Sequence, residues 1–256
     1  MCSKGQKFLK LAALTSTLLI AISAYMLSQG SKAVSADPLS LLACARAEAE
    51  RNFHAFTDLQ CDMISYRKVW QLDGTLDKDN VLVKKLYFKS PDKKKEVFVS
   101  GTMNGKPADK NDFPWERFGM DSTTAFFDIE CLRPEMQGYF EIAEEGTSTV
   151  GGKQMRVLSF KSKDTDKTEM IQGRIVLPPD SCMVNRIEGR MVHKFIQSNE
   201  VNFTATFERV TPNVWLPREV KIHGEIKLGP MKRKIFSRNI FSNCRLNTGL
   251  DDEIFK

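Results

Sequence analysis

Few side chains in this sequence have the spacing that catalysis or metal binding requires. The three histidines, His54, His193 and His223, lie far apart and lack the spacing of metal ligands. The segment Gly146–Gln154 is superficially similar to a phosphate-binding loop, but its lysine is followed by glutamine instead of serine or threonine, and we interpret it as a hairpin turn. Gly-x-Ser-x-Gly, His-Glu-x-x-His and Cys-x-x-Cys motifs are absent from the sequence. We therefore predict that the protein is not an enzyme, and we expect no catalytic residue, metal site or cofactor.

The cysteines allow two interpretations of Cys44. Leu41-Leu42-Ala43-Cys44 is similar to the signal that directs lipidation of a bacterial cysteine, although about 16 residues separate it from the apolar N-terminal run. The interpretation that we favour makes Cys44 a small apolar residue on a helix. Disulfides are plausible in an oxidising compartment, but the spacing does not determine how the cysteines pair. The cysteines concerned are Cys44, Cys61, Cys131, Cys182 and Cys244.

The charge of the chain gives no reason to expect nucleic-acid binding. The formal net charge is +6, but residues 1–36 contain four lysines and no acidic residue. The remaining 220 residues therefore carry 34 basic and 32 acidic side chains. Binding to nucleic acid would require basic side chains concentrated on one face.

The N-terminus has the three parts of an export signal. Lys4, Lys7 and Lys10 precede an uncharged run over 11–27, and Val34-Ser35-Ala36 supplies small residues for cleavage. We predict a secretory signal peptide over 1–36, cleaved after Ala36. The alternative is an uncleaved inner-membrane anchor over 11–27. Either way, residues 37–256 are expected to form a single domain in the periplasm or cell envelope.

The exported part predicts one helix followed by many strands. Asp37-Pro38 is a typical helix start, and apolar residues then recur at helical spacing up to about residue 57. Period-2 alternation and turn residues predict about ten strands. Gly151-Gly152 and Asn104-Gly105 are expected turns. The predicted strands cover 61–72, 81–89, 95–103, 137–145, 154–162, 169–177, 183–195, 201–209, 214–228 and 234–243.

Strands of this number and length predict an α+β, mainly β fold. We expect a large curved antiparallel sheet that forms an unclosed half-barrel. The N-terminal helix and a helical or irregular insertion over 107–120 would cover it. The apolar face of such a sheet needs something to cover it. The helix could fill the hollow completely, or the hollow could be a ligand cavity, and the sequence alone favours neither alternative.

A family resemblance supports the second alternative. The residues that carry it are Asn104–Pro107, Gly173–Ser181, Met183–Gly189 and Val210–Val220, the last containing Val-Trp-Leu-Pro. Over residues 40–246 the chain resembles the LolA/LolB-like superfamily, the outer-membrane lipoprotein-sorting group of bacterial periplasmic proteins. The resemblance implies a half-barrel sheet with a hydrophobic cavity for acyl chains. Members carry lipids or lipoproteins across the periplasm or act as envelope sensors.

We therefore hypothesise a carrier of lipids or lipoproteins that shields acyl chains in its cavity. Its expected partners are these acyl chains and a membrane protein that donates or accepts them. The alternative is a membrane-tethered stress sensor or protein-interaction module on the same scaffold. Cavities for lipids are mostly apolar, and methionine adapts to irregular ligands. The predicted lining is Met183, Ile187, Met191, Phe203, Phe207, Val220 and Ile222.

Overall fold

The computed structural model describes residues 40–90, 93–109, 130–132, 138–163, 169–193, 200–228 and 231–255. The predicted export signal over 1–36 lies outside the described residues. The predicted cover over 107–120 lies outside them as well, apart from its first three residues.

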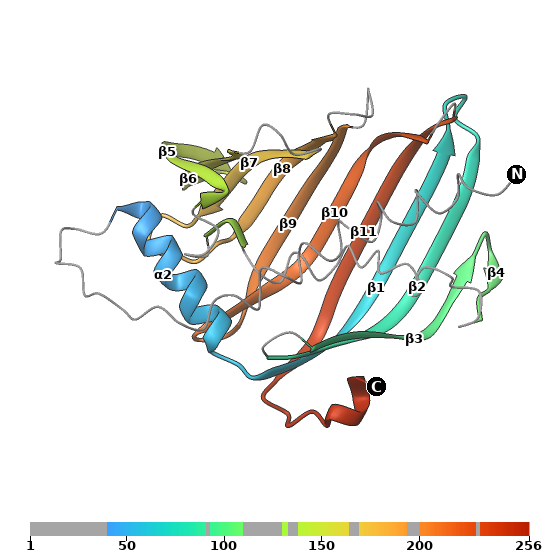
Figure 1. The fold of residues 1–256 in the computed structure, drawn as a ribbon, viewed down its shortest axis with the longest axis horizontal. Helices are drawn as coiled ribbons and strands as arrows, with labels where there is room; N and C mark the ends of the chain where they lie inside the picture. Colours follow the sequence, from blue (N-terminus) through green and yellow to red (C-terminus); the bar gives the residue numbers. More distant parts are fainter. Residues whose placement is uncertain are drawn as a thin grey trace, which may run out of the picture.

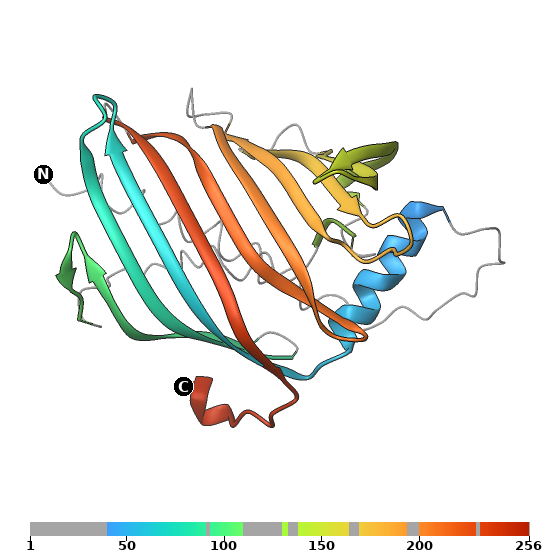
Figure 2. The same ribbon diagram turned by 180° about the vertical axis from the view of Figure 1, so that it is seen from behind.

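The described chain forms one open antiparallel sheet of eleven strands with a single α-helix (Figure 1). The strand order is β4-β3-β2-β1-β11-β10-β9-β8-β7-β6-β5. The first and last long strands, β1 and β11, therefore pair in the middle of the sheet. The sheet is curved and not closed into a barrel, as Figure 2 shows from behind, and this confirms the predicted fold class. The strands are β1 (Asp58–Gln71), β2 (Leu76–Lys89), β3 (Lys93–Met103), β4 (Lys106–Pro107), β5 (Phe140–Val150), β6 (Lys153–Ser162), β7 (Glu169–Leu177), β8 (Arg186–His193), β9 (Glu200–Thr211), β10 (Val214–Leu228) and β11 (Met231–Leu246).

Most predicted strands are confirmed, with shifts at their ends. The predicted strand over 183–195 began too early, because β8 begins only at Arg186 and Met183 belongs to the connection that precedes it. Asn185 donates its backbone N–H to Val176, and this bond still belongs to the turn between β7 and β8. Gly151 and Gly152 both have positive φ angles, 59° and 77°, which fits the predicted two-residue hairpin between β5 and β6.

The helix α2 (Leu41–His54) is shorter than predicted. It begins at Leu41 because Ser40 is its N-cap, and the Ser40 hydroxyl accepts a hydrogen bond from the N–H of Ala43 at 3.2 Å. The predicted start at Asp37-Pro38 is therefore wrong, and these two residues lie outside the described part of the chain.

The two faces of the sheet differ in polarity. We call the face that carries the main apolar cluster the inner face. Residues directly opposite each other on neighbouring strands share a face, and the face alternates along each strand. The inner face therefore contains in-register rows that cross the sheet. One such row is Leu158, Ile175, Ile187, Ala205, Val220 and Asn239.

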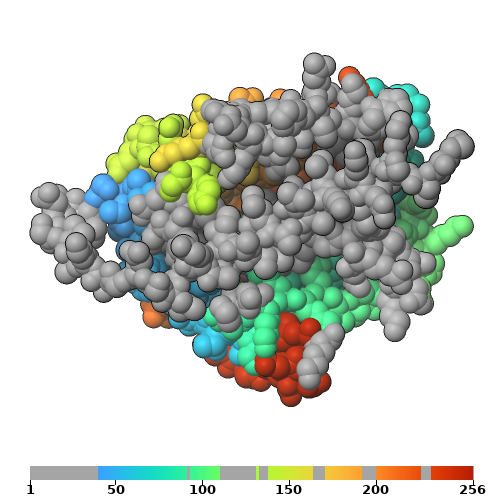
Figure 3. Space-filling view, viewed as in Figure 1, coloured from blue at the N-terminus to red at the C-terminus, as the bar shows by residue number. Residues whose placement is uncertain are grey.

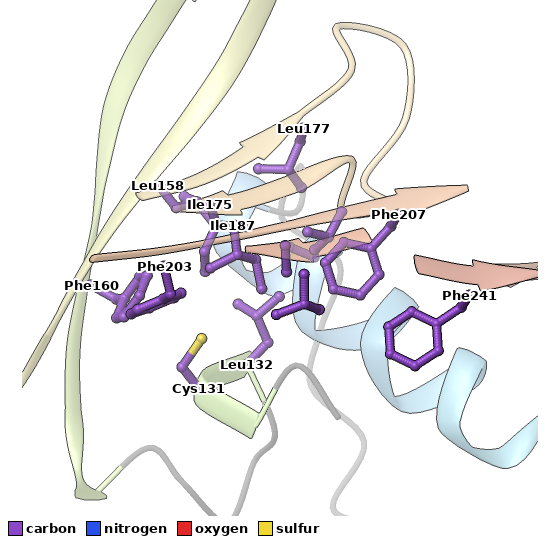
Figure 4. Close-up of a cluster of buried hydrophobic side chains, with 14 of the residues drawn as sticks. Cys131, Leu132, Leu158, Phe160, Ile175, Leu177, Ile187, Phe203, Phe207 and Phe241 are labelled. Atoms are coloured by element: carbon purple, nitrogen blue, oxygen red, sulfur yellow. The ribbon is translucent and has the colours of Figure 1, made fainter. Parts of the chain in front are cut away.

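The main apolar cluster joins α2 and a short 3-10 helix to the inner face. Ala45 of α2 and Leu132 of η4 (Glu130–Leu132) belong to the same buried cluster as Leu158, Ile187 and Phe207 (Figure 4). Both elements lie over the part of the inner face that β6 to β10 form. The helix therefore supplies the cover that the sequence predicts for this part of the sheet.

The C-terminal segment packs at the other end of the sheet. A 3-10 helix, η6 (Asp252–Phe255), lies against β3 at the lower edge in Figure 3. Asp252 pairs with Lys89 at 2.7 Å and with Lys93 at 2.8 Å. Hydrogen bonds from these two lysines lower the pKa of Asp252 to about 2.

Two glycines lie opposite each other on β7 and β8 and allow the strands to approach closely. A Cβ on Gly189 would lie 2.5 Å from the carbonyl oxygen of Gln172 and 2.8 Å from Cζ of Phe203. We expect Gly189→Ala to lower the free energy of unfolding by about 2 kcal/mol, since the backbone must shift. Urea denaturation checks this against Gly138→Ala, whose Cβ would meet nothing within 4 Å. Equal stability of the two variants would contradict the expectation.

Candidate functional site

The structure places six of the seven predicted lining residues on strands of the inner face. Phe203 of β9 lies opposite Ile222 of β10, and Val220 lies opposite Ala205. Met183 is the exception, because it lies in the connection between β7 and β8. The other six lie on three adjacent strands and are Ile187, Met191, Phe203, Phe207, Val220 and Ile222.

These residues differ in how much surface they expose. Four are buried in the main apolar cluster, namely Ile187, Phe203, Phe207 and Val220. Met183, Met191 and Ile222 are only half-buried. Near α2, therefore, the helix fills the hollow of the sheet, and the side chains there form an ordinary packed core.

Farther from α2, a second row of apolar residues crosses the inner face, and we call it the far row. It contains Ile171, Met191, Val201, Gly224 and Ile235, which lie opposite one another in sequence from β7 to β11. All five residues are half-buried. Five strands at a spacing of about 4.8 Å extend about 19 Å across the sheet. The far row therefore offers an apolar surface that the described covering elements leave partly exposed.

The inner face becomes polar where β11, β1 and β2 meet, a feature that the sequence analysis missed. We call these residues the polar patch: Ser65, Arg67, Asn80, Ser237 and Asn239. Arg67 lies opposite Asn80 on one side and Ser237 on the other. Ser65 lies opposite Asn239. A possible signal was the alternation of β1, in which Ser65 and Arg67 follow Met63 on the same face.

The charged side chains in and beside the polar patch differ in how far they are exposed to solvent. The Arg67 side chain is exposed, yet desolvation by the surrounding protein lowers the pKa of its guanidinium. Beside the patch, Lys84 and Glu96 form an ion pair at 2.6 Å, with 19% and 11% of their side chains exposed. A solvent-accessible cation thus lies on the same face as the far row.

A buried asparagine fixes α2 to the sheet. Asn52 donates its amide N–H to the carbonyl oxygen of Trp215 at 3.0 Å and accepts the N–H of Trp215 at 2.7 Å. Asn52 is 8% exposed. This pair of bonds sets where α2 crosses the start of β10.

We expect Asn52→Ala to lower the free energy of unfolding by about 2–3 kcal/mol, because two backbone groups of Trp215 lose their partner. Urea denaturation measures the loss. A suitable control is Arg51→Ala, which removes an exposed ion pair with Glu48 on the same helix. A loss no larger than that of the control would contradict the role of Asn52.

A disulfide connects the other end of α2 to the sheet. Cys44 is bonded to Cys182, in the connection between β7 and β8, and Cys61 is bonded to Cys244. Cys44 lies on the helix, as predicted, but its sulfur is not available for a lipid thioether. The proposed lipidation signal at Cys44 is therefore wrong in this structure. Cys131 is buried in the main cluster and lies outside both disulfides.

Nothing among the described residues contradicts the prediction that the protein has no metal site. His54 ends α2, His223 lies on the outer face of β10, and His193 ends β8. Among the described residues, no group of three histidine, cysteine or acidic side chains could hold a metal ion.

An open hollow of about 770 Å³ lies on the outer face of β5 to β10. Its lining is largely charged or polar and includes Lys161, Arg174, Glu188, Arg190 and His223. Arg174 also pairs with Glu145 of its rim at 2.9 Å. The hollow is open and many of its side chains are charged, so the inner face with its apolar far row is the better candidate site for an acyl chain.

The described residues contain no helix that is long and apolar enough to cross a membrane.

Comparison with known proteins gives matches only among solved structures. No protein-family model and no curated protein sequence matches the chain. One similar structure is a domain from Vibrio parahaemolyticus described as an outer membrane lipoprotein-sorting protein. It is 12% identical, with 84% of this chain and 95% of that chain covered and a TM-score of 0.44.

Two further structures are similar at comparable identity. A DUF1329 family protein from Desulfovibrio piger is 11% identical, with 86% of this chain and 98% of that chain covered and a TM-score of 0.44. The lipoprotein LppX from Mycobacterium tuberculosis is 12% identical, with 81% and 97% covered and a TM-score of 0.24.

Proposed function

We propose that this protein is an exported carrier that binds acyl chains of lipids or lipoproteins on the inner face of its open sheet. The observation that carries the proposal is the far row, an apolar and half-buried surface across five strands. One leaflet of a bilayer core is about 15 Å thick, so a row about 19 Å long can accommodate an acyl chain. Burial of the chain contributes about 0.8 kcal/mol per methylene.

The predicted lining residues have different roles in this proposal. Met191 and Ile222 contact the chain, because both are half-buried and lie in or beside the far row. The four buried residues, Ile187, Phe203, Phe207 and Val220, form the packed floor next to it. Methionine is flexible and polarisable, which suits contact with a mobile chain. Release requires hand-over to a membrane protein in the envelope, since a buried chain does not leave readily.

Export is part of the same proposal. Residues 1–36 act as the signal peptide or as an uncleaved anchor, and residues 37–256 work as one domain in the periplasm or envelope. Two disulfides support this location, because disulfides persist in oxidising compartments and are rare in the cytosol. The proposed activity is binding, and no catalytic residue is assigned.

The test is binding of a fluorescent fatty acid to the delipidated exported protein. Ile222→Glu places a carboxylate beside the far row, and we expect at least about tenfold weaker binding, since the chain would have to desolvate a charge. The matched control is His223→Glu, which adds the same carboxylate at the next position, on the exposed outer face. No uptake by the unsubstituted protein, or equal loss in both variants, would contradict the proposal.

A further inference from the structure

The polar patch lies directly beside the far row, on the same face of the sheet. Ile235, the last residue of the far row, precedes Ser237 of the patch by two positions on β11 and so shares its face. Ser237 lies opposite Arg67, and Arg67 lies opposite Asn80. An amphiphile along the far row would therefore place its polar part at this patch.

Two amide oxygens in the patch are buried, and no described residue donates a hydrogen bond to either of them. Asn80 is 2% exposed and Asn239 is 3% exposed. Among the described residues, no donor reaches Oδ1 of either side chain. Buried polar atoms are nearly always hydrogen-bonded, and an unsatisfied one destabilises the fold. These two acceptors are therefore candidates for hydrogen bonds from a ligand on the inner face.

The two oxygens lie on either side of β1. Asn80 is on β2 opposite Arg67, and Asn239 is on β11 opposite Ser65, two residues farther along β1. Two strand spacings and this offset separate their Cα atoms by about 12 Å. Their side chains both extend over the inner face, so each oxygen can accept a hydrogen bond from its own donor on a ligand bound there.

We propose that the patch selects acyl lipids whose polar part carries hydroxyl or amide N–H donors. This inference rests on the proposed acyl-chain binding and adds the class of polar group to it. Hydroxyl or N–H groups would bond the Oδ1 atoms of Asn80 and Asn239. An oxygen of the same polar part would accept from the guanidinium of Arg67.

Lipids without donors fit the patch less well. An ionised fatty acid or a fully esterified lipid offers oxygen acceptors to Arg67 but leaves both amide oxygens without a partner. A site built around buried acceptors discriminates against ligands that lack the matching donor. The patch therefore favours partially acylated polyols or N-acyl amides over fatty acids and full esters.

The test compares ligands with the same tail by displacement of a bound fluorescent fatty acid. The probes are 1-monopalmitoylglycerol, which has two hydroxyl donors, and N-palmitoylglycinamide, which has amide donors. The reference is the dimethyl ether of 1-monopalmitoylglycerol, which has none. We expect at least one donor ligand to displace the probe at a concentration about tenfold lower than the ether. The stronger of the two shows whether hydroxyl or amide groups are the natural source.

Variants connect the preference to the patch. Asn80→Leu with Asn239→Leu should abolish the difference between ligands while the fluorescent fatty acid still binds. Asn202→Leu, on the outer face of β9, should retain it. Equal displacement by all three ligands in the unsubstituted protein overturns this inference and leaves acyl binding intact. No binding of the fluorescent fatty acid overturns the proposed function and the inference with it.

Discussion

Removal of the Cys61–Cys244 disulfide is expected to lower the free energy of unfolding by about 4 kcal/mol. The bond joins β1 to β11 in the middle of the sheet and links residues 183 positions apart in the sequence. A cross-link between such distant positions restricts the unfolded chain strongly, and the stabilisation grows with the logarithm of the loop length. Urea denaturation of Cys61→Ala with Cys244→Ala measures the loss.

The control for this variant is Cys131→Ala. Cys131 is buried, so its substitution costs only the packing of one small side chain. The substitution leaves both disulfides in place, so reducing agent should still destabilise the control. An unfolding midpoint of the double variant equal to that of the control would contradict a stabilising role for the cross-link.

Asp58→Asn is expected to lower the free energy of unfolding by about 3 kcal/mol at neutral pH. The Asp58 carboxylate is 3% exposed and holds the segment that follows β11. It accepts hydrogen bonds from Thr248 N at 2.7 Å, Thr248 Oγ1 at 2.9 Å, Gly249 N at 2.9 Å and Leu250 N at 3.4 Å. The NH2 group of an asparagine cannot accept hydrogen bonds. Some of the N–H and O–H groups that bond to Asp58 would therefore lose their acceptor in Asp58→Asn.

The stabilisation that Asp58 contributes to the fold should decrease as the pH falls. Burial by itself would raise the pKa of Asp58, but the hydrogen bonds from Thr248, Gly249 and Leu250 outweigh it and hold the pKa below the ordinary value of an aspartate. A carboxyl with a lowered pKa stabilises the fold above its unfolded pKa and loses this effect as the pH falls through the folded value. The stability difference between the unsubstituted protein and Asp58→Asn should therefore shrink below about pH 4.

Denaturation of both proteins at pH 7 and pH 3 tests this dependence. Asp62→Asn is the matched control on β1, because the Asp62 carboxylate accepts one exposed hydrogen bond from Asn243 at 2.9 Å. The control should change stability by less than about 0.5 kcal/mol. A difference for Asp58→Asn that stays constant or widens toward pH 3 would contradict the account.

The strands could be predicted from the sequence because their faces differ in polarity. On β9, Phe203, Ala205 and Phe207 alternate with polar residues, and the structure places them on the inner face. The start of the helix was harder to predict, because Asp37-Pro38 and Ser40 are all common at helix N-termini. Only the hydrogen bond from the Ala43 N–H to the Ser40 hydroxyl identifies Ser40 as the N-cap. The predicted strand over 183–195 began too early, because apolar alternation extends back to Met183 in the connection before β8.

The candidate site was predictable only in part. Its apolar residues on β8 to β10 follow from local alternation. The polar patch depends on β1 pairing with β11, which are the two ends of the meander, and local pattern carries no information on such long-range pairing. The disulfides depend on the same long-range geometry, since Cys61 and Cys244 meet only because β1 and β11 do.

Native mass spectrometry with lipid extraction tests acyl-chain binding on the inner face most directly. The full chain should be expressed with its export signal, recovered from the periplasm or envelope and purified without detergent. We expect a protein mass with bound lipid in defined stoichiometry, with extraction yielding an acyl lipid, and we expect less of this lipid on Ile222→Glu than on His223→Glu. A lipid-free mass that stays unchanged after lipids are offered would contradict the carrier function.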